Sequence, residues 1–201
     1  MTRSAVLASL VVLAGTWATL AAEPESQPSI PAGHPQIPLP EVALDWPKAA
    51  QADVESLDAI MRAFYEAPAG SPGQARDWSR FQSLFVPAAR LIPARQGVDG
   101  TAGAFFLPVA EYIEANKTYF EKGGFWDREV ARRTESFGNI VHVWSTYESR
   151  RKSEDSEPYV RGVNSVQLLK DRDRYWIVSV FWDYERPDNP MPERYLETPA
   201  E

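Results

Sequence analysis

The sequence predicts an α+β fold, in which three N-terminal helices pack on an antiparallel sheet within a single domain. Strand-forming residues are concentrated between Trp126 and Glu185, where β-branched and aromatic side chains crowd segments that turn residues separate. Upstream of this region, apolar residues recur at intervals of three and four, as they do in amphipathic helices. Because helices are grouped ahead of strands instead of alternating with them, the order favours α+β over α/β.

Each helix has its own start and stop signals. The expected helices cover about residues 53–67, 77–86 and 108–122. Asp53 is the expected N-cap of the first helix, and Pro108 occupies the first turn of the third. Between the second and third helices, residues 89–94 are expected to form a short strand, which Pro93 places at an edge or a bulge. That strand is expected to pair with residues 104–107 as a hairpin.

Composition excludes several classes of site. The 201 residues carry a formal net charge of −7 and the sequence pI is near 5.0, so long-range fields repel nucleic acid. The chain has no cysteine, which excludes disulfides and zinc sites of the cysteine type. A transition-metal site is not expected either, because His142 is the only histidine of the folded domain. No cofactor is expected.

Residues 1–22 have the pattern of a secretory signal peptide. Arg3 supplies the positive charge, an apolar run follows, and Ala21 and Ala22 offer small residues for cleavage. A retained membrane anchor is the alternative, although the apolar run is short for a span. With cleavage, the protein is expected to be periplasmic or secreted, without a membrane contact.

Proline density marks the flanks of the folded domain. Residues 23–50 contain seven prolines, a density that excludes helix and central strand and is typical of a disordered spacer. Residues 51–186 are expected to form the α+β domain. The C-terminal tail, residues 187–201, is again rich in proline, although Tyr195 and Leu196 offer apolar contacts to the surface.

The order and length of these elements resemble the nuclear transport factor 2-like superfamily, with its SnoaL-like and ketosteroid isomerase-like groups. The resemblance rests on residues 53–67, 77–93, 137–150 and 163–183. It implies a cystatin-like cone, in which a curved sheet wraps around the helices and leaves an apolar cavity. It also implies dimerisation through the outer face of the sheet. Both faces of the strands are apolar by alternation, which supports a homodimer independently.

Ketosteroid isomerase-like groups need a carboxylate base near the end of the first strand, where this chain has Ile92 and Pro93. Catalysis of the isomerase or dehydratase type would instead use His142 with Asp183 or Tyr65. The competing interpretation makes His142 a packed strand residue and Tyr65 a core residue with a satisfied hydroxyl.

Aromatic residues supply the remaining prediction. The side chains expected to line a pocket for a flat, apolar molecule are Trp78, Phe81, Tyr112, Phe120, Trp144, Asn164 and Trp182. The same aromatics could equally fill a closed core. The sequence therefore predicts an exported protein that binds a small apolar or aromatic molecule or acts as a dimeric scaffold. The alternative is the enzyme described above.

Overall fold

The structure is a computed structural model that describes residues 46–197. Its α-helices are α1 (Gln51–Val54), α2 (Leu57–Glu66), α3 (Trp78–Ser83) and α4 (Val109–Gly123). Its strands are β1 (Phe85–Gln96), β2 (Ala102–Ala104), β3 (Leu107–Pro108), β4 (Trp126–Phe137), β5 (Ile140–Arg150), β6 (Val160–Asp171) and β7 (Arg174–Tyr184). A 3-10 helix, η1 (Glu193–Tyr195), follows the last strand. This order confirms the predicted α+β class.

The sheet is mixed, although mostly antiparallel. Its strands lie in the order β2-β1-β7-β6-β5-β4, and β3 also pairs with β1. Strands β4 to β7 form the predicted antiparallel meander. The prediction of a wholly antiparallel sheet fails only at β1, which runs parallel to β7. Residue alternation along a strand is the same in both directions, so the pattern cannot reveal this pairing.

The first predicted helix is divided in two. Ser56 has an extended backbone and its hydroxyl accepts a 3.1 Å hydrogen bond from the amide of Ala59, so α2 begins after it. Asp53, the expected N-cap, lies inside the one-turn helix α1, and its carboxylate accepts hydrogen bonds from Arg80 instead. The N-cap of α3 is Asp77, at the predicted start of the second helix.

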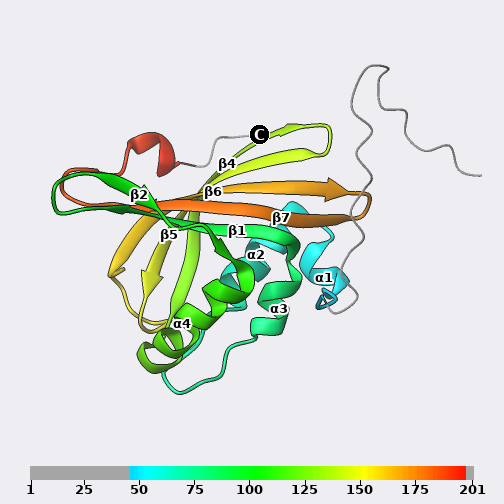
Figure 1. Cartoon of the computed structure of the whole chain (residues 1–201), viewed down its shortest axis with the longest axis horizontal. Helices are drawn as coiled ribbons and strands as arrows, with labels where there is room; N and C mark the ends of the chain where they lie inside the picture. The colour runs from blue at the N-terminus through cyan, green and yellow to red at the C-terminus, as the bar shows by residue number, and fades with distance from the viewer. Residues whose placement is uncertain (1–45, 198–201) are drawn as a thin grey trace, which may run out of the picture. The chain divides into compact units, whose positions relative to one another are not determined.

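The helices lie on one side of the sheet, whereas η1 lies on the other (Figure 1). The helix side forms the core, where Ile60 and Met61 of α2 meet Val143, Val166 and Ile177 of the sheet. These side chains are fully shielded from solvent. On the η1 side, the hydroxyl of Thr146 donates to the backbone oxygen of Tyr195, and the ring of Tyr195 packs on Trp144. The inner face of the sheet therefore packs against the helices, whereas η1 covers part of the outer face.

The predicted signal peptide lies outside the described residues, as do most of the predicted spacer and the last four residues of the tail. Export therefore stays a prediction. Trp46, which was assigned to the spacer, packs against the core, and its indole Nε1 donates a 3.0 Å hydrogen bond to the backbone oxygen of Phe85. No helix within residues 46–197 is long and apolar enough to cross a membrane.

Candidate functional site

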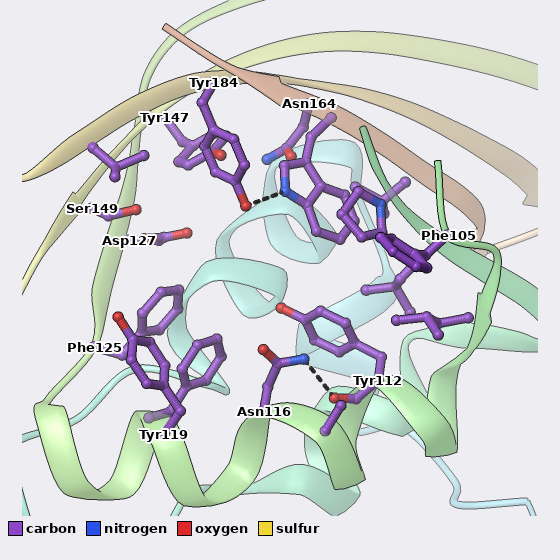
Figure 2. A pocket seen from close by; sticks show the side chains of 18 of the residues that line it. Phe105, Tyr112, Asn116, Tyr119, Phe125, Asp127, Tyr147, Ser149, Asn164 and Tyr184 are labelled. Carbon is purple, nitrogen blue, oxygen red and sulfur yellow. Dashed lines mark hydrogen bonds between the residues drawn. The ribbon is translucent and has the colours of Figure 1, made fainter. Parts of the chain in front are cut away.

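A cavity of about 570 Å³ lies between the inner face of the sheet and helix α4. Its walls come from several elements: α2 contributes Phe64, α4 contributes Tyr112 and Asn116, and the sheet contributes Asn164 and Trp182. Figure 2 shows Tyr112 and Asn116 on one side of this space and Asn164 on the opposite side. The short β2–β3 segment closes one end with Phe105.

Aromatic rings dominate the lining. The five tyrosines of the wall are Tyr112, Tyr119, Tyr147, Tyr159 and Tyr184. Burial raises the pKa of Tyr112 and Tyr147, so both phenols are neutral at physiological pH. Tyr147 is opposite Gly162 on β6, and a Cβ at Gly162 would lie only 2.7 Å from the Tyr147 hydroxyl. The missing side chain at Gly162 therefore makes room for this tyrosine.

Exposed aromatic residues mark the rim of the cavity. Phe105, Tyr119 and Tyr159 line the cavity and are exposed by 59%, 52% and 42%. Arg151 joins two of them: its guanidinium donates a 2.5 Å hydrogen bond to the Tyr119 hydroxyl and lies 4.1 Å from the centre of the Tyr159 ring. This arginine thereby connects α4 to the segment that follows β5.

Among residues 46–197, Asp127 is the only acidic side chain that lines the cavity. It lies on β4 opposite Ser149 of β5, and both side chains point into the cavity (Figure 2). The residue as a whole is half-buried, but its Oδ1 atom is shielded from solvent and has no hydrogen-bond partner among the described residues. Burial raises the pKa of Asp127 to about 7, although a hydrogen bond from Ser149 acts in the opposite direction.

A β-bulge in β4 turns Asp127 inward. From the turn at Gly138 as far as the Ala131–Thr146 pair, the β4–β5 hairpin keeps one register, and the next pair is Glu129 with Tyr147. Val130 is therefore the extra residue of the bulge, and it is 38% exposed. Without the bulge, regular alternation would send Asp127 to the outer face. Bulges commonly re-aim a side chain in this way.

Asp127 was missed at the sequence level for that reason. Charged residues on a strand most simply form cross-strand pairs, as Arg128 and Glu148 do with their 3.3 Å ion pair. A bulge leaves no clear signature in a single sequence. The sequence offered one hint. Tyr147 and Ser149 are two residues apart on β5 and so lie on the same face, which means that the inner face of this strand ends in a polar side chain.

Tyr65 belongs to a hydrogen-bonded chain beneath the cavity. Its hydroxyl accepts a 3.0 Å hydrogen bond from Asn164 Nδ2 and pairs with Ser145 Oγ at 2.6 Å. Ser145 in turn donates to Glu129 Oε1 at 2.5 Å. Burial raises the pKa of Tyr65. Its side chain is buried and its hydroxyl is fully paired, as the core interpretation of this tyrosine expects.

His142 and Asp183 lie on the outer face, away from the cavity. The imidazole Nε2 of His142 is 2.9 Å from Ser165 Oγ, and its ring packs edge-on against Trp144. Asp183 forms a 2.7 Å ion pair with Arg186 beside a smaller hollow of about 350 Å³. On β6, their cross-strand partners are four residues apart, which is about 13 Å along a strand. The structure does not bring the three residues of the enzyme hypothesis together.

Four of the seven residues predicted for the pocket line the cavity: Tyr112, Phe120, Asn164 and Trp182. The other three do not. Trp144 lies on the outer face, because His142 and Trp144 share one side of β5. Phe81 is buried in the core between Phe64 and Phe85, and Trp78 packs behind Phe120. Helical periodicity identifies an apolar face but does not separate core positions from cavity positions.

Within residues 46–197, no group of three or more histidine, cysteine, aspartate or glutamate side chains is placed to hold a metal ion. Acidic side chains close to the cavity form hydrogen bonds or ion pairs with neighbouring residues. Glu129, for example, receives hydrogen bonds from both Arg132 and Ser145. The polar groups that line the cavity therefore suit hydrogen bonding and ion pairing, with Asp127 as the acidic member and Arg95 as the basic one.

Comparison with known proteins concerns the fold. No family model and no curated protein matches the chain. A solved protein of unknown function from Nostoc punctiforme, described as having a cystatin-like fold, is 12% identical, with a TM-score of 0.48 over 65% of this chain and 90% of its own. An NTF2-like protein of unknown function from Silicibacter pomeroyi is 13% identical, with a TM-score of 0.45 over 64% and 92%.

A third similar structure is an uncharacterised protein with a cystatin-like fold from Caulobacter vibrioides, 10% identical, with a TM-score of 0.46 over 66% of this chain and 89% of its own. Two of the three are described as having a cystatin-like fold, and the other as NTF2-like. The observed α+β arrangement, with helices on one side of a mostly antiparallel sheet, is the one that the resemblance in the sequence implies. Activity is left open, because one fold serves many functions.

Proposed function

We propose that this NTF2-like domain binds a small aromatic or largely apolar molecule in its cavity, with one polar group of the ligand held at Asp127. The observation that carries the proposal is the Oδ1 atom of Asp127, which is buried and unpaired at the wall of an aromatic cavity. A buried polar atom without a partner is costly, and a ligand group placed beside it would remove that cost.

The dimensions of the cavity support the same proposal. A volume of about 570 Å³ falls within the usual range for small-molecule sites, which are lined by apolar side chains with a few polar anchors. Phe120, Phe125 and Val180 supply apolar surface, whereas Asn116 and Asn164 supply amides. Flat ligands suit such a wall because aromatic rings pack well by stacking and by edge contacts.

The test introduces a large side chain at the mouth of the cavity. Ala115 is exposed on α4 and lines the cavity, whereas Ala110 is exposed on the same helix and does not. With 2-naphthylmethanol as the probe, titration followed by tryptophan fluorescence should show saturable binding, because Trp182 lies in the wall. Ala115→Phe should weaken that binding by about tenfold, or ~1.4 kcal/mol, while Ala110→Phe leaves it unchanged. Equal binding by both variants would contradict a site in this cavity.

An isomerase- or dehydratase-type enzyme is the alternative to a binding protein. The groups first considered for it, His142, Asp183 and Tyr65, do not converge on the cavity. Such an activity would have to use Asp127, whose pKa of about 7 suits proton transfer near neutral pH. A second titratable group beside it would be needed to complete an acid–base pair, and the tyrosines are the available candidates.

A homodimer through the outer face of the sheet is proposed as well. Three exposed apolar side chains lie on that face of strands β5 to β7: Ile140, Leu169 and Phe181. They are exposed by 60%, 39% and 47%, respectively. Such a patch on adjacent strands favours burial against a second copy. In that arrangement the dimer would leave the cavity on the inner face open.

A further inference from the structure

The strongest unexplained feature of the cavity is a carboxylate without a counter-charge. None of the ion pairs among residues 46–197 includes Asp127. The groups that face it are all uncharged: Ser149 and Tyr147 on β5, Tyr112 on α4, Tyr184 on β7 and Tyr159 before β6. An ionised carboxylate in such surroundings is stabilised most by a cation that the ligand brings.

The rings around Asp127 are suited to the same kind of ligand. The π-face of an aromatic ring attracts a cation that lies within about 6 Å of its centre. Two rings of the wall already receive arginines at the rim: Arg151 lies 4.1 Å from the centre of Tyr159, and Arg95 lies 5.2 Å from that of Tyr184. Inside the cavity, the rings of Tyr112 and Phe125 lie on the same side of the cavity as α4 and face the space next to Asp127 (Figure 2).

We infer that the ligand is an organic amine with an aromatic or alkyl body, whose ammonium group pairs with the Asp127 carboxylate. This inference rests on the proposed binding function and specifies its ligand class. The ammonium group would donate to Oδ1, the atom that has no partner, while the body of the ligand packs against the rings. Asn116, whose amide donates to the Tyr112 backbone at 2.8 Å, keeps its side-chain oxygen for a further N–H of the ligand.

The competing ligand is a neutral molecule with a hydrogen-bond acceptor, such as a carbonyl, which would bind the protonated form of Asp127. The two classes respond to pH in opposite directions. An ammonium ion needs the carboxylate, so its affinity rises by about tenfold between pH 6 and pH 8 and then levels off. An acceptor ligand needs the proton on Asp127, so its affinity falls over the same interval.

The experiment compares two probes of the same shape, (2-naphthyl)methylamine and 2-naphthylmethanol, by isothermal titration calorimetry on the full chain. At pH 8 the amine should bind at least about tenfold more tightly than the alcohol, and Asp127→Asn should remove this preference. Asp173→Asn is the control, since it changes the net charge equally at an exposed turn. It should leave the preference for the amine unchanged.

The possible failures are distinct. If the alcohol binds and the amine binds no more tightly at any pH, the cavity is a binding site but the amine inference is wrong. If neither probe binds while circular dichroism shows a folded protein, the proposed binding function fails together with the inference. An Asp127→Asn variant that keeps the preference for the amine would also overturn the inference.

Discussion

At the scale of single residues, the buried carboxyl of Asp127 makes folding stability depend on pH. Burial raises its pKa from an ordinary value of 3.8 to about 7 in the folded protein. Between these two values the unfolded chain has lost the proton and the folded protein keeps it. Stability therefore falls as pH rises through this window, and it remains lowered above pH 7.

Replacing Asp127 with Asn removes this dependence and keeps the shape of the side chain. We expect the stability of Asp127→Asn relative to the wild type to increase by roughly 1 to 3 kcal/mol between pH 5 and pH 8. Urea unfolding at the two pH values measures the change. The exposed control Asp173→Asn should show no comparable increase. A constant difference for both variants would mean that Asp127 is solvated as an ordinary carboxylate.

The chain from Asn164 through Tyr65 to Ser145 shows what a single sequence can and cannot assign to a residue. That Tyr65 lies on the apolar stripe of its helix followed from periodicity, and the structure confirms its burial. Which polar atoms meet its hydroxyl depends on the register of β5 with β6, where Ser145 is opposite Asn164. Long-range register of this kind is not contained in local patterns.

At the scale of elements, the end of α4 depends on two adjacent glycines with different roles. Gly124 has a φ of +70°, and a Cβ there would lie 2.3 Å from the backbone oxygen of Arg151. Gly123 is the last residue of α4, where a Cβ would meet only the end of the flexible Arg151 side chain, at 3.1 Å. The first position tolerates no side chain, whereas the second does.

Gly124→Ala should therefore destabilise the fold by roughly 2 kcal/mol or more, through backbone strain and the clash with residue 151. Gly123→Ala should stay within about 1 kcal/mol of the wild type, on the stabilising side, because alanine favours the helix. Thermal unfolding of both variants provides the comparison. Equal losses would mean that both glycines serve helix termination alike, without a special requirement at Gly124.

The elements also show where prediction from the sequence stopped. The start of α3 at Asp77 and the end of α4 near residue 122 were predicted, because capping residues act locally. The division between α1 and α2 was not predicted, because Asp53 and Ser56 are both suitable N-cap residues. In the structure Asp53 accepts a hydrogen bond from Arg80, and Ser56 caps α2. The bulge at Val130 was missed too, and with it the inward direction of Asp127.

At the scale of the whole molecule, the α+β class was predictable because it depends on the order of two periodic patterns. The parallel pairing of β1 with β7 was not, since these strands are far apart in the chain and alternation carries no direction. The existence of a cavity was predicted only from the resemblance to a known superfamily. Its position depends on where helix α4 is separated from the sheet. Four of the predicted pocket residues line it because α4 and the last strands form its walls.

The dimer is the prediction that belongs to this scale. At micromolar concentration, light scattering should give about twice the 22.6 kDa mass of the full chain. Ile140→Lys places a charge in the exposed apolar patch of the outer face and should shift the protein to monomers. Val98→Lys is the matched control, because Val98 lies fully exposed in the turn between β1 and β2. A wild-type protein of monomer mass would contradict the dimer and leave the outer face to another partner.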